Sequence, residues 1–346
     1  MIRQHMISRD DAVYECFPDV ALNARGELLC VYRESEHHAD LRSSRLVLRR
    51  SGDGGESWGE KTALTPTGEP SFAYNCPRIS TLPDGSMVIL CDILDRRVGE
   101  SRLVHCEQHI WRSTDGGESW TEPEALPFVG IVPDKYQVLS SGRHLFGIHA
   151  KNDRTGKLEQ YAYYSDDGGK SWTKVLVASD ERYNLCEVSM VEVKPGVVVA
   201  FMRENSGLGY SCKKAISFDG GTTWDGVYDT NIDCCHRPAA GLYAPDGLFM
   251  TYRYMQGGKG WLGSWTQNLF GAFFDMDSAL AKERSEQAAR IFPISYDRST
   301  KADTGYSGWV RLPDGRFYVV NYLLDDAPKA QIRGFSFTIE DVIAEA

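Results

Sequence analysis

The sequence predicts an all-β protein, a six-bladed β-propeller with four-stranded blades that forms a single domain over residues 1–346. Two repeats indicate this fold. A short turn phrase occurs four times, and a second turn, which ends in glycine and precedes an apolar strand, occurs six times. Repeated units of this size bury their apolar faces against their neighbours, which is typical of propellers and solenoids.

The first repeat is the phrase Ser-x-Asp-x-Gly-x-[Ser/Thr]-Trp. Its copies begin at Ser51, Ser113, Ser165 and Ser217. The Asp can accept hydrogen bonds from the backbone of its own turn, and the Gly pair tolerates positive φ, so each copy predicts a hairpin turn. The Trp can pack back beneath the turn. We therefore expect the Asp and Trp of these phrases to be structural.

The second repeat sets the number of blades. Its glycines are Gly26, Gly85, Gly142, Gly196, Gly247 and Gly315. Each lies in a tight turn that joins two strands. In the first four units the turn phrase follows this glycine by roughly 20 to 30 residues, as expected of a second hairpin in the same blade. The helix-like segment 278–289 accounts for the longest spacing, and we expect the residues before Asp10 to add an outer strand to the last blade and close the ring.

Composition and charge exclude some classes of partner. The 346 residues carry a net charge of −10, which attracts neither nucleic acid nor an anionic membrane. The first residues lack the apolar core of a secretory signal, and no run is long enough to cross a membrane. The nine cysteines form no metal-type CxxC pair, and the histidines show no zinc spacing. We expect reduced thiols, a cytoplasmic protein, no metal and no cofactor, and we leave the oligomeric state open.

Ionisable residues converge on the predicted central channel. The innermost strands of a propeller line its channel, so the six glycines also give the blades a common register. Seven residues after each glycine stand Arg33, Asp92, His149, Arg203, Tyr254 with Arg253 beside it, and Tyr322. Seven to ten residues before each glycine stand Cys16 and Phe17, Cys76 and Arg78, Lys135, Glu187, Arg237 and Tyr306. Charged groups that meet in one cavity are costly unless paired or used, so this register predicts a functional site.

The turn phrases resemble the Asp boxes, or BNR repeats, of the sialidase superfamily, and the resemblance extends over nearly the whole chain. The stretch Asn184-Leu-Cys-Glu-Val-Ser-Met and the strand ending at Arg203 resemble the family's fourth blade. This resemblance implies that Glu187 assists the nucleophile and that Arg203 grips a substrate carboxylate. The stretch Gly305-Tyr-Ser-Gly-Trp resembles the sixth blade, which implies that Tyr306 is the nucleophile.

The first blade also resembles its counterpart in that family. The stretch from Leu29 to Asp40 implies that Arg33 contacts the sugar and that Asp40 is the acid/base. The loop from Arg33 to Asp40 is two residues longer than the family spacing, so a neighbouring residue could take the acid role instead. The alternatives are Glu36, His37 and His38.

Three departures from the family pattern concern the arginines that hold the substrate carboxylate. Cys16-Phe17-Pro18 stands where the family has Arg-Ile-Pro, no arginine occurs near Thr266-Gln267, and Asn321-Tyr322 replaces a glutamate. Further arginines that could rebuild an anion clamp are Arg78, Arg237 and Arg253. These departures indicate a divergent member, with a different acidic sugar as a possible substrate.

The favoured function is a retaining exo-glycosidase of sialidase type, which cleaves a terminal acidic sugar with Tyr306, Glu187 and Asp40 as catalytic residues. A tyrosine nucleophile suits a sugar with a carboxylate on its anomeric carbon, because a carboxylate nucleophile would meet like charge. Two alternatives stay open: a uronate polysaccharide lyase that uses Tyr306, Tyr322 and His149, and a non-catalytic sugar-binding propeller. Trp261 and Trp265 could stack on sugar or pack against a blade.

Overall fold

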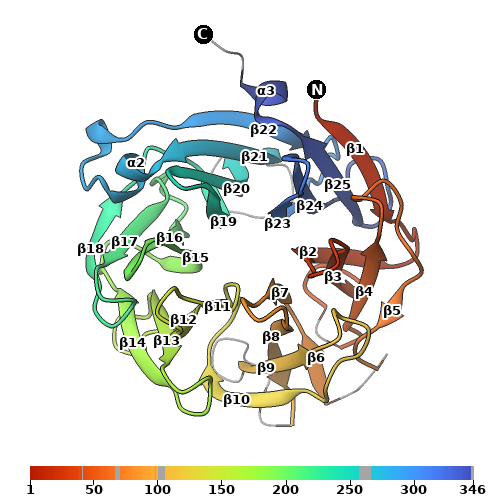
Figure 1. The fold of residues 1–346 in the computed structure, drawn as a ribbon, viewed down its shortest axis with the longest axis horizontal. Helices are drawn as coiled ribbons and strands as arrows, with labels where there is room; N and C mark the ends of the chain where they lie inside the picture. The colour runs from red at the N-terminus through yellow and green to blue at the C-terminus, as the bar shows by residue number, and fades with distance from the viewer. Residues whose placement is uncertain (41, 67–70, 98, 100–105, 257–265, 344–346) are drawn as a thin grey trace.

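A computed structural model describes residues 1–346 except 41, 67–70, 98, 100–105, 257–265 and 344–346. Its six antiparallel sheets follow one another in chain order around a central axis, which confirms the predicted six-bladed propeller (Figure 1). One strand of each blade faces the hub of the ring, and successive strands lie farther from the axis. Trp261 and Trp265 lie outside the described residues.

Blades one to three are meanders whose strands pair in chain order from the hub outward. Blade one contains β2 (Tyr14–Leu22), β3 (Leu28–Ser35), β4 (Arg45–Ser51) and β5 (Thr62–Ala63). Blade two contains β6 (Phe72–Tyr74), β7 (Arg78–Thr81), β8 (Met87–Asp95), β9 (Cys106–Ser113) and β10 (Glu124–Val129). Blade three contains β11 (Gln137–Val138), β12 (His144–Lys151), β13 (Leu158–Ser165) and β14 (Thr173–Ala178). Because β6 and β7 both pair with β8, they are two halves of one interrupted innermost strand.

Blades four to six have the same meander order, and the last also takes in the first strand of the chain. Blade four contains β15 (Leu185–Lys194), β16 (Val197–Glu204), β17 (Lys213–Ser217) and β18 (Asp225–Asp229). Blade five contains β19 (Cys235–Ala244), β20 (Gly247–Gln256), β21 (Thr266–Asp275) and β22 (Arg290–Tyr296). Blade six contains β23 (Thr304–Arg311), β24 (Phe317–Leu323), β25 (Gln331–Phe337) and β1 (Arg3–Ser8).

Pairing of β1 with β25 closes the ring, as the sequence predicts. The two strands run antiparallel, with Arg3 opposite Ser336 and Met6 opposite Arg333. Figure 1 shows β1 lying along the outer side of β25. The last blade thus contains both the first and the last of the described strands, and this pairing holds the two ends of the ring together.

Helical segments among the described residues are short: α2 (Met276–Leu280), the 3₁₀ turn η1 (Arg284–Glu286) and α3 (Ile339–Val342). The single helix expected over 278–289 is therefore wrong, since only its first residues are helical and a 3₁₀ turn follows. The side chains of η1 are exposed, so no packed face stabilises a longer helix there.

The four repeated phrases form one kind of turn. In each, the Ser hydroxyl accepts a hydrogen bond from the backbone N–H four residues later. In the first copy, the N–H of Gly55 donates to Ser51 at 2.9 Å. The Asp carboxylate accepts a hydrogen bond from the backbone N–H four residues after the Asp. In the first copy, the N–H of Ser57 donates to Asp53 at 3.0 Å. At Gly55 only glycine fits, because φ is +90° and a Cβ would lie 2.0 Å from the Tyr318 ring.

Irregular backbone at the start of the innermost strands directs side chains toward the hub. Pairing shifts between Cys16 and Asp19 in β2, across residue 187 in β15, across residues 237–238 in β19 and across residues 306–307 in β23. Left-handed φ values occur at Phe17, Arg237 and Tyr306. Such bulges re-aim a side chain, and each left-handed residue costs about 1–3 kcal/mol, so the rest of the blade must hold it in place.

Apolar side chains fill the space between neighbouring blades. One cluster joins blades one and six through Tyr32, Val320 and Ile332, and another joins blades four and five through Phe201 and Met250. All nine cysteines are free thiols, and only Cys234 is not fully buried. Among the helices of the described residues, none is long and apolar enough to span a membrane.

Candidate functional site

A hollow of about 250 Å³ lies at the hub, where the irregular starts of the innermost strands meet. All six blades contribute to its wall. The charged and polar lining includes His38, His149, Glu187, Arg203, Arg253 and Tyr306. The apolar lining includes Phe17, Cys76, Ile131 and Val132. This mixture of apolar surface with a few convergent polar groups is typical of a ligand site.

Tyr306 and Glu187 meet in this hollow, and Arg203 completes the contact. The Tyr306 hydroxyl donates a hydrogen bond to Oε1 of Glu187. Nη1 of Arg203 donates to both carboxylate oxygens of Glu187 at 2.9 Å, while its Nη2 donates to Asn205 at 2.6 Å. The sequence register placed Tyr306, Glu187 and Arg203 at one mouth of the channel, and the structure brings them into direct contact.

Electrostatics keeps Glu187 ionised and Tyr306 protonated at rest. Burial opposes the charge on Glu187, but Arg203, Arg253 and the Tyr306 hydrogen bond together outweigh it and lower the Glu187 pKa to about 2. Burial, followed by the negative charge of Glu187, raises the pKa of Tyr306 well above its usual value. A phenol next to an ionised carboxylate can therefore release its proton to that carboxylate when the phenol oxygen forms a bond.

Two further arginines lie against the Tyr306 ring. The guanidinium carbon of Arg253 is 5.2 Å from the ring centroid and that of Arg237 is 5.7 Å away. Both side chains are buried, but of the two only Arg253 lines the hollow. Arg237 donates to the carbonyls of Pro133 at 2.9 Å and Val188 at 3.4 Å. Arg237 therefore ties blade five to blades three and four, and Arg253 is the one of the two placed to meet a ligand.

Two of the sequence-predicted residues, His149 and Asp92, hold the backbone of the wall in place. His149 lines the hollow and accepts from the backbone N–H of Glu187 at 3.2 Å, which fixes the irregular segment that carries Glu187. Asp92 is fully buried and accepts from the Asn75 side chain at 2.6 Å and from the Cys76 N–H at 2.9 Å. These bonds hold the break between β6 and β7, so the described contacts of Asp92 are structural.

Arg33 lies behind the wall of the hollow. Its side chain is fully buried, with its guanidinium carbon 4.5 Å from the centroid of the Phe17 ring. It donates to the Asn75 side chain at 3.3 Å and to the His38 carbonyl at 2.5 Å. Phe17, which follows the position where the sialidase pattern has arginine, thus covers Arg33 and presents an aromatic face to the hollow.

The loop after β3 places a different residue in the hollow from the one expected. The Asp40 carboxylate accepts from the Ser43 hydroxyl and from the backbone N–H groups of Arg42 at 2.7 Å and Glu36 at 3.1 Å. Although burial opposes it, these bonds lower the pKa of Asp40. Asp40 lines a separate hollow with Glu36 and Arg42, whereas His38 lines the hub hollow with Tyr306.

Tyr322 contacts an acidic residue, Asp303, that the predictions from sequence did not include in the site. Its hydroxyl donates at 2.8 Å to Asp303, which is fully buried and also accepts from Tyr14. Nδ1 of His38 lies 2.5 Å from the same carboxylate. A signal existed in the register, because Asp303 and Tyr14 each stand three residues before the left-handed residue of their strand, Tyr306 and Phe17.

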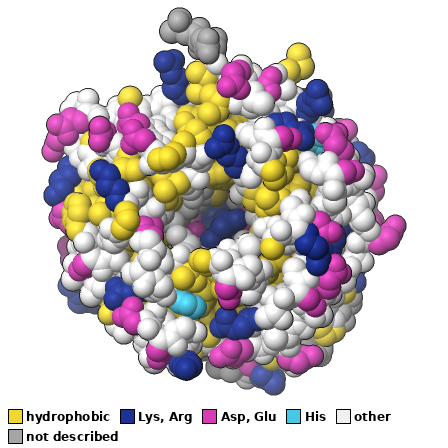
Figure 2. All heavy atoms as spheres, viewed as in Figure 1, with side chains coloured by type: hydrophobic (Ala, Val, Ile, Leu, Met, Phe, Trp, Pro, Cys, Tyr) yellow, Lys and Arg dark blue, Asp and Glu magenta, His cyan; other side chains and the backbone are white. Residues whose placement is uncertain are grey.

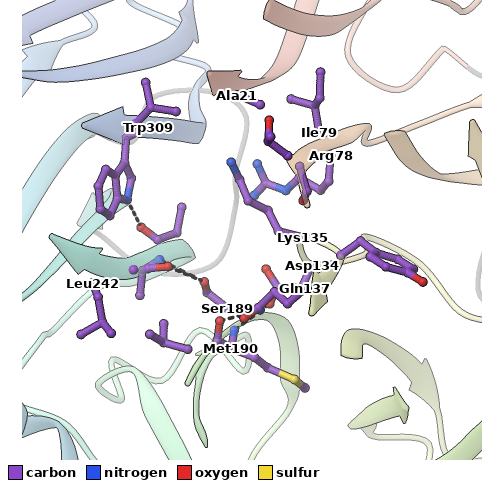
Figure 3. A pocket seen from close by; sticks show the side chains of 18 of the residues that line it. Ala21, Arg78, Ile79, Asp134, Lys135, Gln137, Ser189, Met190, Leu242 and Trp309 are labelled. Carbon is purple, nitrogen blue, oxygen red and sulfur yellow. Dashed lines mark hydrogen bonds between the residues drawn. The ribbon is translucent and has the colours of Figure 1, made fainter. Parts of the chain in front are cut away.

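A larger hollow of about 630 Å³ occupies the channel farther along the innermost strands, and Arg78 belongs to it (Figure 3). Nη1 of Arg78 reaches the Ser307 carbonyl at 3.2 Å and Asp19 at 3.5 Å. Lys135 donates to the Val20 carbonyl at 2.9 Å and lies 3.2 Å from Asp19. Figure 2 shows the ring hollowed at its hub, with basic side chains inside. Arg78 and Lys135 are engaged between blades, so Arg78 is not brought to Tyr306.

The residues present offer no clear metal site. Within the described part of the chain, no group of three or more His, Cys, Asp or Glu side chains is arranged to hold a metal ion. Charged groups of the hub hollow are instead paired with each other, as Arg203 is with Glu187 within blade four.

Comparison with known proteins places this architecture in a family. The sequence pattern of the BNR repeat-like domain matches residues 73–319. A sialidase from Micromonospora viridifaciens is 25% identical over 241 residues, which cover 61% of this chain and 36% of that protein. A sialidase from Bacteroides fragilis is 27% identical over 243 residues, which cover 60% of this chain and 42% of that protein. The chain therefore matches less than half the length of either relative.

A solved structure has the same fold over its whole length. A protein of unknown function from Dyadobacter fermentans superposes with a TM-score of 0.79 at 23% identity, covering 97% of this chain and 98% of that one. The residues that match the family span most of the chain, and Glu187, Arg203 and Tyr306 lie within that range. The chain therefore belongs to the BNR repeat-like domain family, as a divergent member of the sialidase superfamily.

Proposed function

We propose that this protein is a retaining exo-glycosidase that cleaves a terminal acidic sugar, with Tyr306 as nucleophile and Glu187 as its base. The observation that carries the proposal is the hydrogen bond from the Tyr306 hydroxyl to Glu187 in a hollow lined by Arg203 and Arg253. The two curated relatives are sialidases, which supports a glycosidase of this type.

The pair has the chemistry of an activated nucleophile. As the Tyr306 oxygen attacks the anomeric carbon, its proton passes to the ionised Glu187 carboxylate, so negative charge reaches the oxygen only while the new bond forms. A carboxylate nucleophile would repel an anion on the anomeric carbon, at a cost that grows as water leaves the site. The Tyr306 and Glu187 pair therefore favours a substrate with a carboxylate next to the reacting carbon.

The hollow indicates the size and charge of the substrate. Its volume of about 250 Å³ is below the range of about 300–1,000 Å³ that is typical of drug-sized ligands, so it suits a single terminal sugar. Arg203 and Arg253 supply the positive charge. Cys16 stands where the sialidase pattern has an arginine, so fewer arginines would hold the sugar's carboxylate, and the neighbouring Phe17 would offer the sugar ring an aromatic face.

A panel of aryl glycosides tests the proposal. The panel contains sialic acid, a 3-deoxy-ulosonic acid and a uronic acid, each linked to a chromogenic phenol. We expect release of the phenol from an ulosonic or sialic acid substrate, with retention of anomeric configuration in the first product. Replacement of Tyr306 by Phe is expected to abolish turnover and to leave sugar binding intact, because only the hydroxyl is lost.

A matched control comes from a second phenol and carboxylate pair. The Tyr161 hydroxyl donates to Glu159 at 2.7 Å on β13, away from the hub hollow. Tyr161→Phe should leave turnover unchanged, whereas full activity in Tyr306→Phe would contradict the nucleophile assignment. An unsaturated product that absorbs in the near ultraviolet would show a lyase instead. A rise in melting temperature with sugar but no turnover would show a binding protein.

A further inference from the structure

His38 reaches the candidate active site from the loop after β3. It lines the hub hollow together with Tyr306 and Glu187, and its side chain is about one tenth exposed. Asp40, in the same loop, lines a different hollow, and its carboxylate is occupied by the loop's own N–H groups and by Ser43. Of the loop residues that could donate a proton, His38 is the one brought to the nucleophile.

A buried carboxylate orients the His38 ring. Nδ1 of His38 lies 2.5 Å from Oδ2 of Asp303, which is fully buried. The hydroxyls of Tyr14 and Tyr322 also donate to the Asp303 carboxylate, one to each oxygen. Three donors from two blades therefore fix this carboxylate, and a carboxylate on one ring nitrogen sets the tautomer and stabilises the imidazolium form.

Aromatic packing places His38 and the nucleophile on one wall. The Phe17 ring lies edge-on to His38 at 5.0 Å between centroids and lies 4.8 Å from the Tyr306 ring. Tyr322 packs on both, at 6.3 Å from His38 and 6.5 Å from Tyr306. A sugar bound against Phe17 would thus lie between a phenol oxygen and an imidazole.

We propose that His38 is the catalytic acid/base of the reaction and that Asp303 is its positioning residue, in place of the aspartate that the sialidase pattern predicts in this loop. The inference rests on the proposed function, because it assigns the proton donor for the same glycosidic bond. Nδ1 is held by Asp303, so Nε2 is the nitrogen that exchanges the proton with the substrate.

The two steps balance as follows. In the first, the Tyr306 oxygen bonds to the anomeric carbon and gives its proton to Glu187, while the departing oxygen keeps the electron pair of the broken bond and takes a proton from His38. In the second, water attacks the anomeric carbon and gives a proton to His38. The bond between the anomeric carbon and Tyr306 breaks as the bond to water forms, and Glu187 returns its proton to the phenol oxygen.

The charges around His38 set the expected pH dependence. Burial lowers the pKa of His38, Asp303 raises it, and Arg33 and Arg253 lower it, with a net shift below the usual value. Tyr14 and Tyr322, the phenols packed against it, stay protonated because their pKa values are raised by burial and by Asp303. The first step needs protonated His38, so kcat/KM should fall as pH rises through a pKa below 6.5.

Leaving-group dependence tests the assignment within a single preparation of each variant. Wild type, His38→Gln and Asp40→Asn are compared on two substrates that contain the same acidic sugar. In one the leaving group is a nitrophenol, and in the other it is the hydroxyl of a second sugar. A nitrophenolate is a weak base and can leave without taking up a proton, whereas an alkoxide is a strong base and must be protonated as it leaves. We expect His38→Gln to lose about 10²–10⁴-fold on the alcohol substrate and far less on the nitrophenyl substrate. Misfolding would reduce both rates equally, so their ratio reports the acid.

The positioning role of Asp303 has its own readout. Asp303→Asn keeps the size of the side chain but removes the charge that stabilises protonated His38, so the fall in kcat/KM should move to lower pH. An equal loss on both substrates in His38→Gln would overturn the proposal, as would a leaving-group effect in Asp40→Asn alone. Loss of activity in Tyr306→Phe with an unchanged substrate ratio in His38→Gln would refute this inference and leave the proposed function standing. No turnover by the wild type would refute both.

Discussion

Replacing Glu187 by glutamine tests the electrostatic centre of the site through stability as well as activity. Glu187 and Arg203 are each 4% exposed and share two hydrogen bonds of 2.9 Å. Removal of one partner from a buried ion pair costs about 3–5 kcal/mol, because the other charge stays buried without compensation. Unfolding entropy for 346 residues is roughly 0.7 kcal/mol per kelvin, so the melting temperature should fall by about 4–7 °C.

The pH dependence of this loss separates charge from packing. The folded-state pKa of Glu187 is about 2, below the ordinary value of 4.5. Its charge therefore stabilises the fold fully above pH 4.5, and that contribution is lost as pH falls toward 2. Thermal melts of both proteins should differ most near neutral pH and converge between pH 4.5 and pH 2.5. A constant difference across this range would refute the electrostatic account.

Glu159→Gln is the matched control for this prediction. Glu159 is also buried, and its carboxylate accepts hydrogen bonds from Asn152, Ser179 and Tyr161. These three donors are uncharged, unlike Arg203 at Glu187. We expect a smaller loss of about 1 kcal/mol there, as for a single hydrogen bond. Glu187→Gln should in addition reduce turnover by about 10²–10⁴-fold, as for loss of a general base. An equal melting shift and full activity in both variants would contradict the reasoning.

Three further changes probe the scaffold. Asp19→Ala removes the buried carboxylate near Arg78 and Lys135, and should lower stability by about 3–5 kcal/mol, measured by denaturant unfolding. Gly55→Ala forces a Cβ into the Tyr318 ring at a φ of +90°, and should lower the melting temperature, whereas the same change at Gly26, where nothing lies within 4 Å, should cost less. Removal of β1 exposes the edge of β25, and should produce aggregation in light scattering.

The sequence predicts the scaffold well because its signals are local and repeated. Turn chemistry fixes each hairpin, and six repeats of a glycine before an apolar strand fix the number of blades. The same register predicts that Tyr306 and Glu187 share one mouth of the channel, because each stands nine residues before the glycine of its blade. Residues at the same position in equivalent strands therefore lie at the same end of the channel, even when they belong to different blades.

The parts of the site that sequence reasoning missed depend on distance along the channel and on loop shape. Arg78 is two residues beyond Cys76, so it points toward the same channel but about 7 Å farther along it, in the larger hollow. The choice between His38 and Asp40 depends on how the loop folds, which spacing alone does not determine. Asp303 comes to the site through its contact with His38, which lies in another blade, and sequence spacing does not reveal such a contact.

Closure of the ring by β1 also sets an order of assembly. β1 and its partner β25 are the first and the last of the strands described along this chain, with Arg3 opposite Ser336. A contact between residues so far apart in the chain forms late, because the ordering of the intervening loop must come first. Blade six carries Tyr306, so the phenol meets Glu187 of blade four only once blade six has been made and has docked into the ring.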